Sequence, residues 1–218
     1  MGVNRHQDYA YIGNAVPNNL HWLDVKKMRD AGFRIIRSAH YPQDPAFMDA
    51  CDELGMFIIV ATPGWQYWNP EPVFEERILS DIRNMVRRDR NHPSVLLWEP
   101  VLNETAFPES FAQNAYRATH EEYPAPGCYA AIDDKSKGAM GYDVVYTAPK
   151  NEAFYRNAGK SCFTREYGDC VDDWNSHNSY SRVAREWGEE PQIRQAQHYA
   201  RKDYGGSLTV DQFYKSPR

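Results

Sequence analysis

Short runs of apolar residues alternate along this chain with longer stretches in which apolar residues recur at helical spacing. The clearest run covers residues 56–61 and is uniformly apolar, as strands covered on both faces are. The longest helical stretch covers residues 73–90, directly before another apolar run at 95–102. Because parallel strands need a crossover between them, this alternation predicts a parallel α/β fold.

Eight strands are expected, which predicts a (β/α)8 TIM barrel. Such a barrel usually needs about 250 residues, and this chain has 218. We therefore expect a single barrel domain over residues 1–218 that is compact or has an incomplete or atypical last strand, excised from a longer multidomain protein. The expected strands are 2–6, 33–38, 56–61, 95–102, 128–132, 144–146, 161–166 and 206–210, and the expected helices are 18–32, 45–55, 73–90, 108–122, 150–157 and 190–202.

Composition narrows the classes of partner. The net charge of −5 leaves no basic footprint for nucleic acid, and no apolar run is long enough to span a membrane. The 15 Tyr and 6 Trp suit a cleft that packs on sugar rings, or they fill the core. Cys51, Cys128 and Cys162 lie in expected core elements and are expected to be buried free thiols. Their sparse number, with Cys170, leaves the compartment open, and a periplasmic or extracellular location is favoured over a cytoplasmic one.

Polar residues follow several of the apolar runs, where the active site of such a barrel gathers. Glu104 and Glu166 follow the fourth and seventh runs. Two facing carboxylates are what glycosidic cleavage needs, with about 5–5.5 Å between them for retention and about 6.5–9.5 Å for inversion. The other residues expected to converge there are Arg5, His6, Arg37, His40, Asn103 and Tyr146.

Some polar residues have a simpler explanation. His92, in the segment 91–93, is expected to set a turn, and Asp52 with Glu53 to form a solvated helix face. Arg5 and His6 form a buried polar pair in one interpretation and line the site in the other. Glu99 follows Trp98 but precedes a proline, and it is expected at most to support the site from behind.

In several segments the chain resembles the catalytic barrel of glycoside hydrolase family 2, the group of β-galactosidases, β-glucuronidases and β-mannosidases. Each matching segment is weak alone, and their common order makes the likeness specific. The segments are 2–6 (GVNRH), 36–42 (IRSAHYP), 51–55 (CDELG), 88–95 (RDRNHPSV), 98–104 (ending in Asn-Glu) and 164–168 (TREYG).

The resemblance implies roles for both carboxylates. Glu104 resembles the acid/base and Glu166 the nucleophile of a retaining double displacement. Asn103 would hydrogen-bond the sugar 2-hydroxyl, a contact that strengthens in the transition state. Glu104 has to keep its proton until it donates, whereas Glu166 has to be ionised.

The resemblance also assigns supporting residues. Arg37 is expected beneath Glu166, where a cation favours the charged carboxylate. Tyr146 resembles the tyrosine that hydrogen-bonds the nucleophile, and His40 would line the sugar pocket together with His6. The aromatic residues Trp65, Tyr67 and Trp68 are expected to form sugar subsites.

Two departures from the family pattern bear on function. The third strand ends in Ala-Thr-Pro-Gly-Trp at 61–65, without an acidic residue. No Glu-x-His pair stands where the galactosidase branch binds magnesium, so we expect no catalytic metal and no cofactor. The last expected strand lacks the usual Trp, and the family's β-sandwich domains are missing.

The sequence therefore predicts a β-galactosidase-like glycosidase that hydrolyses the O-glycosyl bond of a terminal β-linked carbohydrate. An endo-acting β-glycanase on the same barrel and an inactive carbohydrate-binding fragment stay open as alternatives.

Overall fold

The computed structural model describes residues 2–9, 12–147, 156 and 159–165. The chain divides into two compact units, one of residues 1–8 and 14–167 and the other of residues 9–13 and 168–218. All the described helices and strands belong to the first unit. The fold and the site below are those of this first unit.

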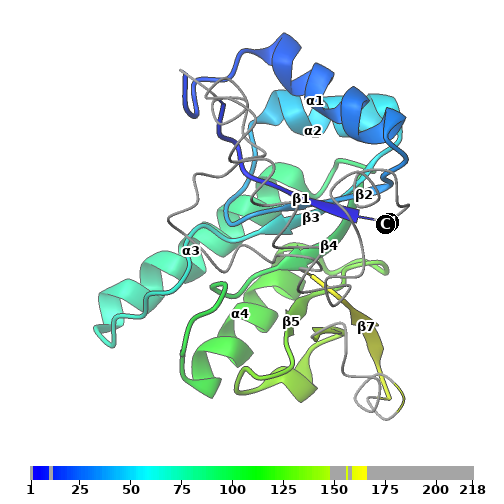
Figure 1. Ribbon diagram of the computed structural model, residues 1–218. Coiled ribbons are helices and arrows are strands. Elements are labelled where there is room, and N and C mark those ends of the chain that lie inside the picture. Colours follow the sequence, from blue (N-terminus) through cyan, green and yellow to red (C-terminus); the bar gives the residue numbers. More distant parts are fainter. Residues whose placement is uncertain (1, 10–11, 148–155, 157–158, 166–218) are drawn as a thin grey trace, which may run out of the picture. The chain divides into compact units, whose positions relative to one another are not determined.

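The first four strands form one parallel sheet in chain order, and each strand after the first is reached through an α-helix (Figure 1). The register places Arg37 beside Asn4 on one side and Ile59 on the other. This repeated strand–helix crossover confirms the predicted parallel α/β class. The strands are β1 (Gly2–Arg5), β2 (Ile35–Ser38), β3 (Phe57–Ala61) and β4 (Val95–Glu99).

Three shorter strands form a second parallel sheet, β5 (Ala131–Asp133), β6 (Val144–Tyr146) and β7 (Ser161–Phe163), with the 3-10 helix η1 (Ala139–Gly141) before β6. A parallel bridge between Trp98 and Ala130 links the two sheets, and the Trp98 amide donates to the Tyr129 carbonyl over 2.9 Å. The strand order thus continues from β4 to β5, as in a barrel wall. The expected eighth strand at 206–210, the helix at 190–202 and most of the helix at 150–157 lie outside the described residues.

Four helices connect the strands: α1 (Asn18–Asp30), α2 (Pro45–Leu54), α3 (Pro72–Asp89) and α4 (Glu109–Glu122). The second helix shows how local sequence sets the ends. The Asp44 carboxylate accepts from the Ala46 amide over 2.8 Å at the start, and Pro45 occupies the first turn. Gly55 ends α2 with φ 67°, a left-handed conformation that favours glycine.

Strand side chains alternate between two cores. Ile58, Val60 and Trp98 face outward and are fully or almost fully buried with residues of the covering helices. Ile59 and Leu97, one position away, face inward and pack with Tyr146 in a separate cluster. This period of two directs every second residue at the strand ends into the barrel, where the site lies.

Two of the cysteine predictions are confirmed. Cys51 and Cys128 are buried and free, whereas Cys162 is free but only half-buried. Burial raises the pKa of the Cys51 thiol to about 12 and that of Cys128 to about 11, so both are inert thiols at neutral pH. Cys170 lies outside the described residues.

The turn before β4 depends on a side chain of α2. Asp52 Oδ2 lies 2.6 Å from His92 Nδ1, and Asp52 Oδ1 accepts from the Ser94 amide over 3.0 Å. His92 is therefore a turn residue, as predicted. The prediction of Asp52 as part of a solvated helix face is wrong, because this carboxylate is half-buried and ties α2 to the turn, whereas Glu53 is exposed.

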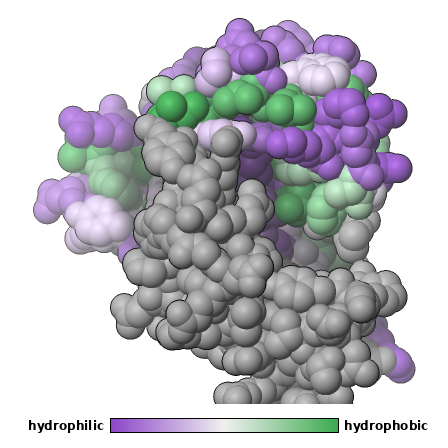
Figure 2. Space-filling model, turned by 45° about the horizontal axis from the view of Figure 1, so that its top comes forward, coloured by the Kyte–Doolittle hydropathy of each residue, from purple (hydrophilic) through white to green (hydrophobic). Residues whose placement is uncertain are grey.

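The outer surface is mixed. Figure 2 shows hydrophilic residues over most of the described surface turned to the viewer, with smaller hydrophobic patches between them. Exposed large hydrophobic residues include Phe57 and Val73, at 49% and 50% exposure. Among the helices of the described part, none combines the length and the apolar character needed to cross a bilayer.

Candidate active site at the carboxyl ends of the strands

A buried ion pair occupies the inner end of the first sheet. The Arg37 guanidinium donates from Nε to Glu99 Oε2 over 2.7 Å and from Nη2 to Glu99 Oε1 over 2.6 Å. Both side chains are 3% exposed. Two parallel charge-assisted bonds in such a place fix the orientation of the guanidinium. Glu99 is thus a central member of the site, although the sequence suggested a minor supporting role.

His40 and Asn103 are attached to this pair. Arg37 Nη2 lies 3.3 Å from His40 Nδ1 and 3.3 Å from Asn103 Oδ1, and Asn103 Nδ2 lies 3.3 Å from His40 Nε2. Burial, with a smaller effect of the Arg37 charge, lowers the pKa of His40 to about 4. A neutral imidazole has one lone pair, so only one of these two donors can bond to it; with the lone pair on Nε2 it accepts from Asn103, whereas an imidazolium accepts from neither. The Asn103 amide is therefore held in one orientation by a neutral histidine and a buried cation.

Glu104 has a strained backbone and an open side chain. Its φ is 48°, unusual for a residue other than glycine. The Asn103 carbonyl before it accepts from the Gln66 amide over 3.0 Å and from Thr105 Oγ1 over 2.8 Å, which holds the turn in place. The Glu104 carboxylate is exposed, accepts from Gln66 Nε2 over 2.6 Å and lies 3.9 Å from Arg165 Nη2.

Aromatic rings line the side of the site next to His40. The His6 and His40 rings meet edge to face with centroids 5.4 Å apart, and the Trp65 ring lies 5.7 Å from His40. Trp65 is 44% exposed and Tyr67 is 60% exposed, so both are accessible to a ligand. Trp68 is half-buried and packs against Phe74 and Phe111.

Arg5 does not join this group. Its guanidinium binds Asp24 over 2.9 Å, contacts His21 Nδ1 at 3.2 Å, donates to Gln43 and lies 4.2 Å from the centre of the Phe47 ring. All these partners come from α1, α2 and the loop before α2. Since neighbours on a strand face opposite ways, Asn4 contacts Arg37 instead, at 3.4 Å from Nη1. The expectation that Arg5 converges on the site is wrong, because Arg5 is a buried supporting residue. His6, the other member of the expected pair, is exposed at the site.

The second sheet contributes Asp133, Tyr146 and Arg165. Burial raises the pKa of Asp133 to about 6, and the Arg165 guanidinium opposes that change from 3.1 Å. Burial also raises the pKa of Tyr146. Within the described part of the chain, Tyr146 Oη and Arg165 Nη1 are buried without a hydrogen-bond partner. Two unsatisfied donors in one region need an acceptor, because a buried donor without one is costly.

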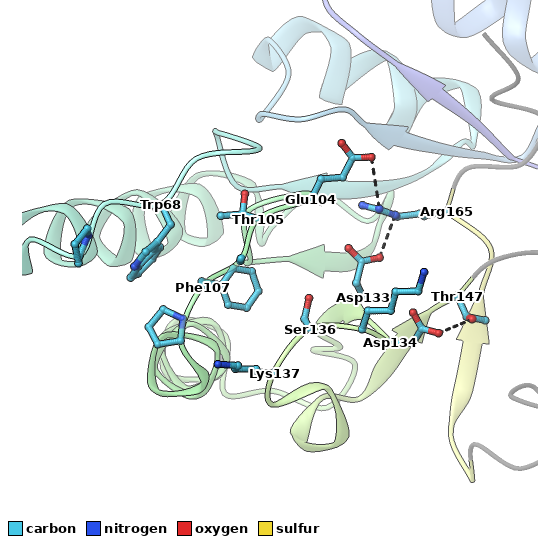
Figure 3. Close-up of a pocket in the computed structure, with 14 residues that line it drawn as sticks. Trp68, Glu104, Thr105, Phe107, Asp133, Asp134, Ser136, Lys137, Thr147 and Arg165 are labelled. Atoms are coloured by element: carbon cyan, nitrogen blue, oxygen red, sulfur yellow. Dashed lines mark hydrogen bonds and ion pairs between the residues drawn. The ribbon is translucent and has the colours of Figure 1, made fainter. Parts of the chain in front are cut away.

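A pocket of about 900 Å³ opens beside Glu104 (Figure 3). Trp68 and Phe107 lie at one end, and Glu104, Arg165 and Asp133 lie at the other, with Arg165 between the two carboxylates. The pocket is lined by Trp68, Pro70, Glu104, Thr105, Ala106, Phe107, Pro108, Asp133, Asp134, Lys135, Ser136, Lys137, Thr147 and Arg165. Its size is that of a small-molecule site.

The structure brings together most of the predicted residues. His6, Arg37, His40, Asn103 and Tyr146 form one connected group near Glu104. Glu166 lies outside the described residues, so the predicted Arg37–Glu166 contact and the spacing of the two glutamates stay predictions. In the described part of the chain, no three His, Cys, Asp or Glu side chains are grouped as a metal site.

Three contributors were missed or underrated: Asn4, Glu99 and Asp133. A usable signal was present, because Glu99 follows Leu97 by two residues and Asp133 follows Ala131 by two, and both apolar residues face inward. Extending the inward face to the end of each strand would have selected these carboxylates.

Comparison with known families places this fold. The family model for the TIM barrel domain of glycosyl hydrolases family 2 matches residues 1–125. This match covers more than half of the chain, and the chain belongs to glycoside hydrolase family 2. The barrel fold and the family predicted from the sequence motifs are confirmed.

Curated relatives include β-galactosidases. The one from Thermoanaerobacterium thermosulfurigenes is 38% identical over 125 residues, which are 56% of this chain and 17% of that protein. A putative β-glucuronidase from Formosa agariphila is 33% identical over 44% of this chain and 12% of its own length. This chain therefore matches only a small part of the length of these relatives.

Solved structures show the same fold. A β-glycosidase from Bacteroides vulgatus has a TM-score of 0.61 and 27% identity over 75% of this chain and 22% of its own. An FMN-binding β-glucuronidase from Facaelibacterium prausnitzii L2-6 has a TM-score of 0.70 and 22% identity over 92% of this chain and 34% of its own. The second likeness, at that identity, concerns the fold alone.

Proposed function

We propose that this barrel hydrolyses a terminal β-linked sugar, a β-galactoside first, by a retaining double displacement with Glu104 as acid/base and Glu166 as nucleophile. The observation that carries the proposal is the position of Glu104. It stands exposed in the loop that follows β4, on a strained turn, directly after an Asn103 that is held by His40 and Arg37.

The two chemical steps assign a task to each glutamate. In the first, the Glu166 carboxylate attacks the anomeric carbon, the bond from that carbon to the glycosidic oxygen breaks, and Glu104 gives its proton to the leaving oxygen. In the second, water attacks the anomeric carbon and gives a proton to Glu104, and the bond to Glu166 breaks. The products are a sugar of the original anomeric configuration and the free leaving group.

The surrounding residues suit these steps. Asn103 would bind the 2-hydroxyl, and its fixed orientation avoids reorganisation as the transition state forms. Tyr146 Oη and Arg165 Nη1 are two buried donors without a partner among the described residues, and we assign the Glu166 carboxylate as their acceptor. Arg37 would contribute its charge from beneath, with Glu99 fixing the guanidinium.

The charge of Arg165 near Glu104 is balanced within the site. The Arg165 guanidinium lies 3.9 Å from the carboxylate of Glu104, the residue to which the proposal assigns the acid step. Asp133 is closer to that cation, at 3.1 Å, and on ionisation offsets it. We assign Asp133 the role of limiting the effect of Arg165 on Glu104.

The proposed substrate is taken from the relatives of this chain. Several curated relatives are β-galactosidases, which makes a terminal β-galactoside the first substrate to test. An endo-acting enzyme and an inactive carbohydrate-binding barrel remain the two alternatives.

Hydrolysis of an aryl β-galactoside tests the proposal. Glu104→Ala and Glu166→Ala should each lose several orders of magnitude in kcat with the folded state retained, and Glu53→Ala, an exposed glutamate on α2, should not. Added azide should rescue Glu166→Ala as the α-glycosyl azide and Glu104→Ala as the β-azide, which NMR distinguishes. Equal rates in the wild type and Glu166→Ala exclude the enzyme; products of inverted configuration exclude retention.

A further inference from the structure

In the described part of the chain, two residues other than glycine have a positive φ, and they are hydrogen-bonded to each other. Gln66, in the loop after β3, has φ 59°, and Glu104, in the loop after β4, has φ 48°. A Cβ makes this conformation unfavourable, so it persists only where the surrounding structure holds it, and such residues are concentrated at functional sites. The shared conformation therefore draws attention to Gln66, to which the proposed function assigns no task.

The loop after β3 is attached to the loop after β4 through its backbone. The Thr62 amide donates to the Glu99 carbonyl over 2.9 Å. Further along, the Gln66 amide donates to the Asn103 carbonyl over 3.0 Å, and a parallel bridge pairs Trp65 with Asn103. The pairing of β3 with β4 is thus continued past the ends of both strands. These bonds set the position of Gln66 relative to the loop after β4 before any side-chain contact is considered.

The side chain of Gln66 adds a bond to one oxygen of the Glu104 carboxylate. Its Nε2 donates to Glu104 Oε2 over 2.6 Å, which is a charge-assisted hydrogen bond when the carboxyl is ionised. The other oxygen, Oε1, lies 3.9 Å from Arg165 Nη2, beyond hydrogen-bond distance (Figure 3). An amide is a neutral donor, so it can also bond to the carbonyl oxygen of a protonated carboxyl. With Oε2 occupied in this way, Oε1 is the oxygen that carries the proton of Glu104.

We propose that Gln66 is a positioning residue for Glu104, which it holds so that Oε1 gives the proton in the first step and takes it in the second. Without the bond to Oε2, the carboxyl group rotates about the last torsion of its side chain, a broad one with little preference of its own. Only part of these orientations directs Oε1 at the glycosidic oxygen, and the reaction slows accordingly. This inference rests on the proposed function, because it takes Glu104 as the acid/base.

Two aryl β-galactosides separate proton transfer from the rest of the reaction. Phenol is a poor leaving group and needs the proton of Glu104, whereas 2,4-dinitrophenolate leaves without one. Both substrates form the same glycosyl-enzyme, and kcat/KM reports the steps up to its formation. Because the dinitrophenyl substrate forms it fast, its kcat reports the second step, in which Glu104 takes a proton from water. Loss of the positioning bond should lower kcat/KM for the phenyl substrate. For the dinitrophenyl substrate it should lower kcat and KM together.

The test uses the full chain with Gln66→Asn and Gln66→Gly. Both replacements tolerate a positive φ, so the backbone stays as it is, while the side chain is too short or absent. Gln113→Asn is the matched control, because Gln113 is exposed on α4 and its Nε2 also donates to a glutamate, to Glu109 Oε1 over 3.3 Å. We expect each Gln66 variant to lose about 10-fold in kcat/KM for the phenyl substrate, the low end for a hydrogen bond to a charged group. kcat/KM for the dinitrophenyl substrate should stay as it was, and Gln113→Asn should change neither substrate.

Glu104→Ala is the reference that keeps the two levels of the argument apart. It should lose far more kcat/KM for the phenyl substrate than either Gln66 variant. If it loses none, the proposed function itself fails, and this inference fails with it. A loss in Glu104→Ala with wild-type kcat/KM in both Gln66 variants overturns the positioning role alone. An equal loss on both substrates in the Gln66 variants also overturns it, because that pattern indicates a general structural effect.

Discussion

The two sheets of the barrel wall differ in how their inward polar groups are satisfied. In the β1–β4 sheet, Arg37 and Glu99 form two bonds with each other and the guanidinium also holds His40 and Asn103. In the β5–β7 sheet, Tyr146 Oη and Arg165 Nη1 have no partner within the described residues. The inward polar groups of the first sheet are bonded to one another, and we call them the finished network. The second sheet has buried donors without an acceptor among the described residues, and we call it the open sheet. Such a division is expected of a catalytic site, in which fixed side chains orient the groups that bind to the unsatisfied donors.

The largest expected effect comes from removing one member of the Arg37–Glu99 pair in the finished network. Glu99→Ala leaves the Arg37 charge buried without its carboxylate, and removing one member of a buried pair costs about 3–5 kcal/mol. Urea unfolding of the full chain, followed by Trp fluorescence, measures this loss. Arg83 and Glu121 form an exposed pair at 2.8 Å, so Glu121→Ala should change stability by less than about 1 kcal/mol.

A double substitution checks the cause. Arg37→Met with Glu99→Leu removes both charges, so it should recover most of the stability lost in Glu99→Ala. It should not recover activity, because the guanidinium that orients Asn103 is gone. A double variant as unstable as Glu99→Ala would show that the pair itself, rather than the unpaired charge, determines the loss.

The second prediction concerns the pH dependence of the finished network. His40 has a pKa of about 4 in the folded chain, lowered by burial, against 6.5 in the unfolded chain. The unfolded chain therefore takes up a proton first as the pH falls, and stability decreases from about pH 6.5 toward pH 4. At about 1.4 kcal/mol for each pKa unit, the loss is on the order of 3 kcal/mol. Unfolding of the wild type and His40→Gln between pH 4 and 7 should show a shallower slope in the variant.

His21 provides the internal control for that slope. Its pKa is lowered as well, through burial and the neighbouring Arg5, and it is present in both proteins. The difference between the two slopes therefore isolates His40. Equal slopes would mean that His40 takes up its proton at the same pH in the folded and unfolded chains, which would contradict a pKa lowered by burial and by the Arg37 guanidinium.

The open sheet predicts the opposite sign of pH dependence. Asp133 has a folded pKa of about 6, raised by burial from 3.8. The folded chain holds this proton more tightly, so the Asp133 contribution to stability is present below about pH 4 and is lost as the pH rises to about 6. The expected size is on the order of 3 kcal/mol. Asp133→Asn should remove this decrease in unfolding measurements, and a variant that keeps the wild-type profile would assign the titration to another group.

How far the sequence predicts this arrangement follows from two kinds of signal. Apolar runs such as 56–61 locate strands, because strands covered on both faces must be apolar throughout. Motif order locates Asn103–Glu104, since both stand in a segment whose neighbours also match. Neither signal tells which way a strand-end side chain points. Arg5 and Asn4 are adjacent, and only the pairing of Asn4 with Arg37 across β1 and β2 decides that Asn4 faces the site.

Charge pairing is harder to predict than position. Arg37 and Glu99 are 62 residues apart in the chain, and nothing local to Glu99 indicates its partner. The strand order, which places β3 between β2 and β4, brings the two side chains together across the barrel interior. The same holds for Asp133 and Arg165, on β5 and after β7. Long-range partners of this kind depend on topology, which periodicity alone does not determine.

The prediction with the smallest effect on stability compares two buried tyrosines. Tyr142 Oη donates to the Ala112 carbonyl over 2.7 Å, so Tyr142→Phe leaves that buried acceptor unpaired and should cost about 1 kcal/mol. Tyr146 Oη has no partner among the described residues, and Tyr146→Phe should therefore destabilise the chain less than Tyr142→Phe. Urea unfolding of the two variants measures this difference.

Activity should reverse the order of the two tyrosines. If Tyr146 donates to the Glu166 carboxylate, removing a bond to a charged group should lower kcat/KM for an aryl β-galactoside by about 10- to 100-fold. Tyr142 packs against Tyr116 with ring centroids 5.2 Å apart, in the cluster that covers α4, and Tyr142→Phe should keep wild-type kcat/KM. A Tyr146→Phe variant with full activity and a stability loss equal to that of Tyr142→Phe would make its hydroxyl an ordinary structural donor. Of the two donors, only Arg165 Nη1 would then support the description of the second sheet as open.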